Sequence, residues 1–217
     1  MGLFKLLKTL KTILTEASEL SGPVNVSFRR AKPWKSQKTG KWYVFFDNVE
    51  MGPECLVGEE GKGLRHVFAG LNPERVIAAA INNGISRFAI EKGAQQSKDR
   101  SVWNTPIGAH QGIAHPLAKA YIVVQQARLM TARAAALSDA GSPDAGEIAN
   151  MAKLAAADAS LEALDQAIQI HGGNGLAIEY GLADLWFIAR LHKTAPVSRE
   201  MILNFVAQHS LGLPKSY

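Results

Sequence analysis

Three turn-like segments are the first places in this sequence where a ligand could bind. GEEGKG at 58–63 precedes a helical stretch, and HGGNG at 171–175 follows another. Glycine lets a backbone approach a ligand closely, although a sequence such as HGGNG can also simply end a helix. Arg100 lies in the third segment, SKDRSVWNTPIG, with Trp103 three residues further on. An arginine can pair with a phosphate and an aromatic ring can pack beside a flat cofactor, whereas an exposed arginine and a surface tryptophan need no ligand.

Metal binding and nucleophilic catalysis find little support in the residue pattern. None of the six histidines belongs to an H-x-x-x-H or H-x-x-E-H arrangement, and Cys55 is the only cysteine. His110 and His115 are five residues apart, which does not place them on one face of a helix. These spacings predict no metal site. No serine or cysteine triad signature is present either.

Long helices would have to position these turns. After residue 58 the composition is dominated by Ala, Leu, Ile and Gln with apolar periodicity. The pattern predicts helices at about 64–96, 107–140, 144–171, 182–191 and 197–211. We expect the first to be interrupted near 71–73, with Asn72 as an N-cap and Pro73 in a new first turn. Three long helices with short connections predict an antiparallel bundle.

The N-terminal part has a different character. Residues 1–20 interleave lysines with Leu, Phe and Ile, which predicts a short amphipathic helix that could lie on a membrane or cover an apolar patch of its own protein. The sequences at 24–28 and 41–51 are strand-like. The basic stretch 29–40 between them is expected to form a loop. So few strands cannot form a stable sheet alone.

Composition narrows the function classes. The chain is 47% hydrophobic with a formal charge of +5. Its basic residues are concentrated before residue 45, where they could attract an anionic partner or form a solvated arm. No apolar run approaches the roughly 20 residues that span a bilayer, and the N-terminus is a poor match to a secretory signal. A single cysteine allows no internal disulfide, which favours a reducing compartment such as the cytoplasm.

Taken together, four ordered segments resemble the acyl-CoA dehydrogenase family. They are FFDNVEMGPECLVGEEGKGL at 45–64, LNPER at 71–75, DRSVWNTPIGAHQGIAHPLA at 99–118 and AIQIHGGNGLAIEY at 167–180. The resemblance covers about residues 45–211. It implies a mainly α protein, an antiparallel bundle like the family's C-terminal domain, with a small N-terminal β remnant. The implied divisions are an amphipathic helix at 1–20, a remnant of the middle β-domain at 21–58 and an FAD-binding bundle at 59–217. The family's N-terminal half has no counterpart in this sequence.

The resemblance also implies that FAD is the cofactor and that it lies between subunits. Arg100 matches the arginine that holds the flavin pyrophosphate, and Trp103 stands where the family usually has phenylalanine. Gln169 and Gly173 match positions that reach the FAD of a neighbouring subunit. The remaining positions implied to bind FAD are Val102, His110, Gln111, Gly172, Ser198 and Glu200.

The reaction that the resemblance implies is removal of an α-proton from an acyl thioester, with hydride transfer from the β-carbon to the flavin. Most family members carry the catalytic glutamate near the C-terminus, and we align that position with Pro196, which cannot act as a base. Some members carry it on an earlier helix in an L-x-x-E-R segment. LNPER therefore suggests Glu74 as the base, with Asn72 and Arg75 beside the substrate. Alternatively, Glu74 is a first-turn glutamate that favours the helix dipole.

Three functional classes remain open. The chain could be an FAD-dependent acyl-CoA dehydrogenase that forms a homodimer or homotetramer and passes electrons to an electron-transfer flavoprotein or a similar acceptor. It could instead be a non-catalytic helical module that pairs with full-length subunits of the family. A domain that binds DNA or RNA is the third class, but the basic residues lie outside the predicted bundle and no nucleic-acid motif is present. We therefore expect no nucleic-acid partner.

Overall fold

The computed structural model of the chain describes residues 31–35, 42–46 and 52–215. The amphipathic helix predicted at 1–20 and the strand predicted at 24–28 lie outside the described residues. The chain divides into two units, Met1–His66 and Val67–Tyr217. Each unit is described by itself.

The first unit contains a pair of antiparallel strands. β1 (Ala31–Lys35) pairs with β2 (Trp42–Phe46), with Ala31 opposite Phe46 and Lys35 opposite Trp42. β2 confirms a strand within the predicted range 41–51. The loop predicted at 29–40 is wrong for β1, because pairing with the aromatic β2 holds this basic segment in an extended conformation. A short 3-10 turn, η2 (Pro53–Cys55), follows.

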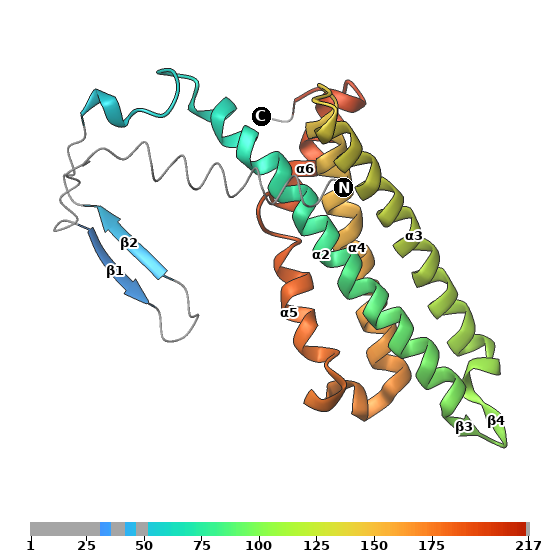
Figure 1. Ribbon diagram of the computed structural model, residues 1–217. Helices are drawn as coiled ribbons and strands as arrows, with labels where there is room; N and C mark the ends of the chain where they lie inside the picture. Colours follow the sequence, from blue (N-terminus) through green and yellow to red (C-terminus); the bar gives the residue numbers. More distant parts are fainter. Residues whose placement is uncertain (1–30, 36–41, 47–51, 216–217) are drawn as a thin grey trace. The chain divides into compact units, whose positions relative to one another are not determined.

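The second unit is built around three long helices (Figure 1). They are α2 (Gly63–Asp99), α3 (Gln111–Asp139) and α4 (Ala145–His171). Asn83 of α2 donates a hydrogen bond to Thr131 of α3 at 2.9 Å, and Ser160 of α4 donates to Asn82 of α2 at 3.0 Å. Ten residues further along α2, a Cβ at Gly93 would lie 3.4 Å from Leu117 of α3 and 3.5 Å from Ala167 of α4. α3 therefore runs antiparallel to α2, and α4 runs parallel to α2. The predicted mainly α, antiparallel helical bundle is confirmed.

α2 is one continuous helix, so the interruption predicted near 71–73 is wrong. Pro73 lies inside it and Asn72 is not an N-cap. A proline in a helix removes the hydrogen bond to the carbonyl four residues earlier. That carbonyl belongs to Ala69, which is exposed, so water can take the bond. Glu74 consequently lies in the helix interior, far from the N-terminal dipole that the alternative interpretation required.

Left-handed residues end two helices and build the turn between α2 and α3. Gly141 follows α3 with φ +64°, and Gly172 ends α4 with φ +61°. Both positions suit glycine because it has no Cβ. Between α2 and α3, β3 (Ser101–Val102) pairs with β4 (Thr105–Pro106) in a two-residue hairpin. Trp103 and Asn104 form its reversal with φ +53° and +63°.

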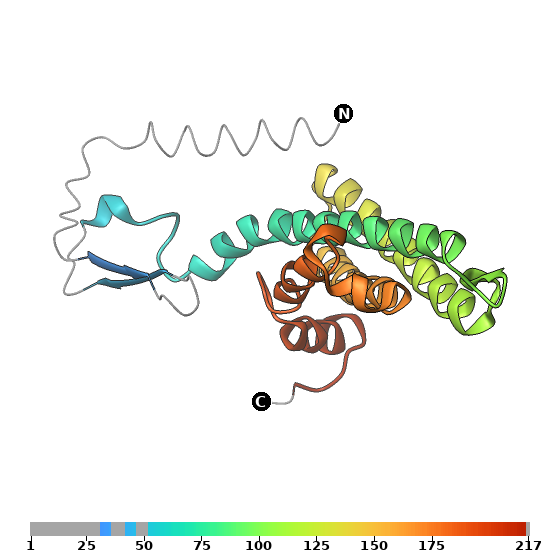
Figure 2. The ribbon, with the colours of Figure 1, turned by 90° about the horizontal axis from the view of Figure 1, so that it is seen from below.

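The C-terminal part packs short elements against α4. After α4 come η4 (Gly172–Leu176), η5 (Ile178–Tyr180), α5 (Ala183–Leu191), α6 (Arg199–Phe205) and the π-helical η6 (Val206–Ser210). α5 and α6 both contact α4, and Figure 2 shows them on one side of the long helices. The predicted last helix begins two residues later than expected, because Ser198 caps it by accepting a hydrogen bond from the amide of Met201 at 3.3 Å.

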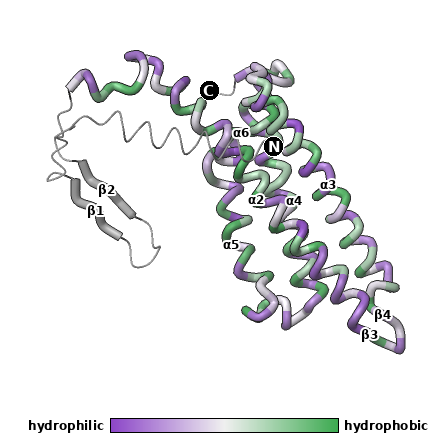
Figure 3. The backbone as a smooth tube through the Cα atoms, in the orientation of Figure 1, coloured by the Kyte–Doolittle hydropathy of each residue, from purple (hydrophilic) through white to green (hydrophobic). Residues whose placement is uncertain are grey.

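The core of the second unit is rich in alanine. Fully buried alanines recur along α2, α3 and α4, and Leu164 and Val124 fill the space between them. Small side chains let helices approach closely, as at Gly93 of α2, where a Cβ would meet Ala167 of α4 at 3.5 Å. Figure 3 shows hydrophobic and hydrophilic residues interspersed along each long helix. Within the described ranges, no helix combines the length and apolar composition needed to cross a membrane.

Candidate functional site

The predicted site residues fall into two groups at different places along α2. One group surrounds the hairpin after the C-terminus of α2. The other surrounds Glu74, nearer its N-terminus. Glu74 and Asp99 are 25 positions apart on this helix, which at 1.5 Å per residue is about 38 Å. A single copy of the chain therefore does not bring Arg100 and Glu74 together.

The first group is the arginine cluster, which we define as Arg100, Trp103, His110 and Gly172. The β3–β4 hairpin presents Arg100 as an exposed side chain directly after α2. The amide of Ile107 donates to the carbonyl of Arg100 at 2.8 Å, which closes the base of the hairpin. A Cβ at Gly172 would lie 3.8 Å from Nη1 of Arg100. The hairpin and the C-terminus of α4 thus meet at the guanidinium.

Trp103 and His110 form the aromatic part of the arginine cluster. Their rings are 5.9 Å apart in an edge-to-face arrangement, and the tryptophan is 85% exposed. His110 precedes α3, whose first residue is Gln111. Nε2 of His110 is buried and has no hydrogen-bond partner among the described residues. A buried polar atom without a partner is uncommon in folded proteins and indicates a place where a ligand or water can bond.

The turn after α4 adds open backbone to the arginine cluster. A Cβ at Gly173 would meet no atom within 4 Å, so this backbone is accessible. Gln169, in the last turn of α4, is exposed. Gly175 is buried, and a Cβ there would lie 2.6 Å from the carbonyl oxygen of Ile168. The turn therefore folds back on α4 through Gly175 while Gly172 and Gly173 face outward.

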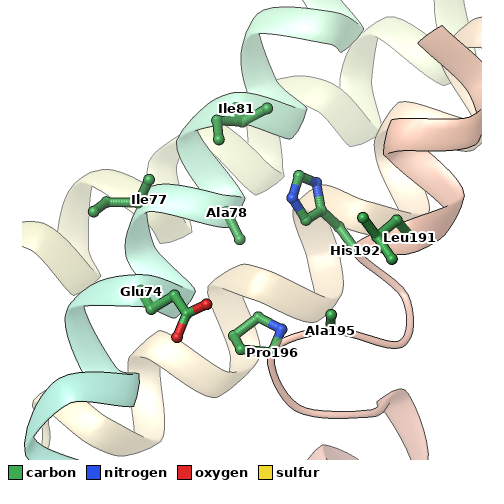
Figure 4. A pocket seen from close by; sticks show the side chains of 8 residues that line it. All are labelled: Glu74, Ile77, Ala78, Ile81, Leu191, His192, Ala195 and Pro196. Atoms are coloured by element: carbon green, nitrogen blue, oxygen red, sulfur yellow. The ribbon is translucent and has the colours of Figure 1, made fainter. Parts of the chain in front are cut away.

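The second group is the Glu74 pocket, a cavity of about 270 Å³ (Figure 4). One wall comes from α2 and the other from the end of α5 and the segment after it. The lining residues are Glu74, Ile77, Ala78, Ile81, Leu191, His192, Ala195 and Pro196. Only Glu74 and His192 among them are ionisable. The pocket is therefore an apolar cavity with a carboxylate at one position and an imidazole at another.

The α5–α6 segment that forms this wall is fixed to α4. Asp158 of α4 pairs with Lys193 at 2.9 Å and with Arg199 at 2.7 Å, at either end of the segment. Between them, Nζ of Lys153 donates to the carbonyl of Val197 at 2.6 Å. Lys153 is only 1% exposed. Burial and the nearby Arg75 charge lower the pKa of Lys153 to about 8.

Arg75 faces away from the Glu74 pocket and into the bundle. It is 1% exposed, and its guanidinium donates to the side-chain oxygens of Asn72 and Asn150 and to the carbonyl of Leu71. Burial lowers the pKa of Arg75, and the neighbouring Glu74 partly offsets this effect. The predicted roles of Asn72 and Arg75 beside a substrate remain predictions. In this chain both side chains belong to an internal hydrogen-bond network.

Ser198 and Glu200 belong to the Glu74 end of the bundle. The Ser198 hydroxyl caps α6, and Glu200 is exposed in its first turn. Their predicted contact with FAD stays a prediction, as does that of Val102, which is half-buried in β3. Among the described residues, no group of three or more His, Cys, Asp or Glu could hold a metal ion.

Sequence comparisons match these features to a known family. The C-terminal domain model of acyl-CoA dehydrogenase matches residues 61–211. The chain belongs to the acyl-CoA dehydrogenase family. It is 56% identical over 178 residues to acyl-CoA dehydrogenase fadE12 of Mycobacterium bovis, a match that covers 82% of this chain and 46% of that protein. The chain thus spans about half the length of the curated relatives it matches.

Solved structures of acyl-CoA dehydrogenases share the fold. A glutaryl-coenzyme A dehydrogenase in complex with glutaryl-CoA matches with a TM-score of 0.77 and 28% identity, over 86% of this chain and 49% of that one. The butyryl-CoA dehydrogenase of Megasphaera elsdenii matches with a TM-score of 0.71 and 29% identity, over 77% of this chain and 43% of that one. These matches confirm the helical C-terminal domain that the sequence motifs predicted.

Two features of this chain were missed by sequence reasoning. His192 shares the Glu74 pocket although 118 positions separate the two residues, and no spacing rule connects them. Lys153 lies on the buried face of α4, four positions after Ala149 and three before Ala156, both of which are buried. That helical spacing was a usable signal. A lysine spaced with buried alanines on a helix indicates either that its charge is buried or that the predicted buried face of the helix is wrong.

Proposed function

We propose that this chain takes part in FAD-dependent α,β-dehydrogenation of an acyl-CoA thioester. The observation that carries the proposal is Glu74, a carboxylate on the wall of an apolar cavity of about 270 Å³. An acyl chain is apolar and its α-proton needs a base within hydrogen-bonding reach. The glutaryl-CoA complex of a structurally similar dehydrogenase supports a CoA thioester as the ligand class.

The proposed catalytic base is Glu74. Its carboxylate would take the proton from the α-carbon, so the C–H bond breaks and its electron pair moves toward the thioester carbonyl. The apolar side chains of Ile77, Ile81 and Leu191 would hold the acyl chain beside the carboxylate. Bound FAD would supply the acceptor for the β-hydride, and an electron-transfer flavoprotein or a similar acceptor would take the electrons onward.

The arginine cluster fits the dinucleotide part of FAD. Arg100 offers an exposed guanidinium to a pyrophosphate, and the outward-facing backbone of Gly172 and Gly173 allows close approach. His110 offers a buried ring nitrogen without a partner. Trp103 offers an exposed aromatic face. Gln111 and Gln169 lie beside these groups at the ends of α3 and α4.

We further propose that each complete site uses two copies of the chain. About 38 Å of α2 separates Glu74 from the arginine cluster, a span longer than an extended FAD molecule. The arginine cluster of one copy would bind the FAD whose reactive ring lies at the Glu74 pocket of another. A homodimer or homotetramer would provide this arrangement, because a symmetric interface repeats each contact twice.

The test of the base is Glu74→Gln, which keeps the side-chain size and hydrogen bonding but cannot take a proton. We expect the purified chain to bind FAD, to oxidise an acyl-CoA with an artificial electron acceptor and to lose that activity in the variant. Glu91→Gln, on the same helix and exposed, serves as the control. Retained turnover in Glu74→Gln would remove the assignment.

Sharing of the site is tested by mixing variants. Glu74→Gln and Arg100→Ala should each be inactive alone. When they are denatured, mixed and refolded, mixed pairs contain one site with both native residues, so activity should return. If mixed oligomers form but the dehydrogenase activity does not return, the site is not built from two copies.

A non-catalytic assembly module remains the second candidate. Several large apolar side chains are exposed on the described part of the chain, including Phe187 at 70% and Ile178 at 79%. Exposed apolar surface favours association. A folded chain that pairs with a full-length acyl-CoA dehydrogenase, but shows no flavin absorbance with added FAD, would favour this alternative.

A further inference from the structure

The Glu74 pocket contains a second ionisable side chain, His192, that the proposed chemistry has not used. His192 follows the last turn of α5, and its ring enters the pocket from the wall opposite α2 (Figure 4). The other lining residues apart from Glu74 are apolar. A polar side chain in an otherwise apolar cavity is suited to orient a ligand.

We propose that His192 donates a hydrogen bond to the carbonyl oxygen of the bound thioester while Glu74 takes the α-proton. This inference rests on the proposed function, because it assumes that an acyl thioester occupies the pocket. It assigns to His192 the stabilisation of the charge that develops on the substrate.

The hydrogen bonding of His192 supports a ligand contact. Nδ1 of the ring is buried and has no hydrogen-bond partner among the described residues. A buried polar atom without a partner destabilises the folded chain. A ligand that brings a polar group into the pocket lets the ring complete its bonding. The alternative, that His192 orients Glu74, lacks a hydrogen bond between the two side chains, and Figure 4 shows the carboxylate turned toward Pro196.

The protonation state of His192 suits a neutral donor. Burial lowers its pKa, and the nearby positive charge of Lys153 lowers it further. The ring is therefore neutral near pH 7 and carries one N–H and one free ring nitrogen. It can donate a hydrogen bond without bringing a second charge next to the Glu74 carboxylate.

The chemistry of proton removal next to a carbonyl requires such a donor. When the α C–H bond breaks, its proton moves to Glu74 and its electron pair spreads onto the carbonyl oxygen. A hydrogen-bond donor at that oxygen is worth more in this state than in the resting thioester, so it accelerates the step. A carboxylate base paired with a neutral imidazole is an arrangement that supports this reaction type.

The experiment compares the full chain with His192→Gln and His192→Phe, using butyryl-CoA labelled with ¹³C at the carbonyl. In the wild-type complex with FAD, the infrared stretch of the labelled carbonyl should move to lower frequency than in water. Phenylalanine should lose this shift and lower kcat roughly 10²–10³-fold with little change in KM. Glutamine can still donate and should restore part of both. His115→Gln, an exposed histidine on α3, is the control.

The outcomes separate this inference from the proposed function. If wild type binds and oxidises butyryl-CoA but the carbonyl frequency is the same in His192→Phe, the role of His192 is wrong and the proposed function stands. If the His192→Phe chain does not fold, His192→Ala takes its place. A folded His192→Ala chain with the wild-type carbonyl frequency and the wild-type kcat would refute the role of His192. If wild type neither binds nor oxidises the thioester, the proposed function fails and this inference fails with it.

Discussion

Lys153 makes the stability of this chain depend on pH in an unusual direction. It is 1% exposed on α4, and its pKa falls from the ordinary value of 10.5 to about 8. In the unfolded chain the lysine regains its ordinary pKa. Between pH 8 and 10.5 the unfolded chain therefore binds more protons than the folded chain, so the free energy of unfolding rises with pH across this window.

The size of the effect follows from the two pKa values. At 1.36 kcal/mol per pH unit, the full difference is about 3 kcal/mol. About 2–3 kcal/mol of it should appear between pH 7 and pH 10, because folded Lys153 is mostly neutral at pH 10 and unfolded lysine is mostly charged. Other groups that titrate in this range contribute to the wild-type curve as well.

The variant Lys153→Met isolates the lysine, because methionine keeps the length of the side chain and removes its charge. Urea unfolding at pH 7, 8, 9 and 10 gives the free energy of unfolding for wild type and variant. We expect the wild type to gain about 2–3 kcal/mol relative to the variant as pH rises. At every pH the variant also leaves the carbonyl of Val197 without its donor, which shifts its whole curve by a constant.

Lys119→Met removes an exposed lysine on α3 and serves as the control. Its difference from wild type should not change with pH by more than a few tenths of a kcal/mol. If the difference between wild type and Lys153→Met is equally flat from pH 7 to pH 10, the lysine is not destabilised by burial, and our explanation of its environment is wrong.

Two further changes test the turn after α4 and the attachment of the α5–α6 segment. Gly175→Ala should cost about 1–3 kcal/mol in thermal unfolding, because its Cβ would lie 2.6 Å and 2.8 Å from backbone atoms of Ile168. Gly173→Ala, whose Cβ would meet nothing within 4 Å, should change stability little, and equal losses would contradict the geometry. Asp158→Asn should cost about 1 kcal/mol at low salt, since it removes partly exposed ion pairs to Lys193 and Arg199. This loss should shrink at high salt, and a loss that salt does not change would argue against an electrostatic contribution.

Much of the bundle could be predicted because its signals are local. Glycines at 141 and 172 mark helix ends through a backbone conformation that other residues avoid, and both ends lie where the sequence placed them. Pro73 misled the prediction for α2. A proline starts a helix most comfortably in its first turn, but an exposed backbone tolerates it inside one. The packing around the segment decides whether a proline starts a helix or lies inside one. A local sequence pattern holds no information about that packing.

The pocket could be predicted only in part. Glu74 was found through a short motif, but its counterpart His192 arrives from another helix, and only the packing of α5 on α4 brings it there. Asp158 was not predicted as the anchor of the α5–α6 segment, because its partners are more than 30 positions away in the sequence. Whether the Glu74 pocket and the arginine cluster share a ligand depends on a second copy of the chain.

The hairpin between α2 and α3 has a consequence for how this protein could be altered. Its reversal places Trp103 and Asn104 in left-handed conformations that glycine adopts more easily. A tryptophan there costs conformational energy, yet its ring projects almost entirely into solvent. Selection for thermal resistance alone would favour replacing this indole, whereas selection for ligand affinity would retain it. Variants selected for thermal stability and variants selected for ligand affinity should therefore differ at Trp103.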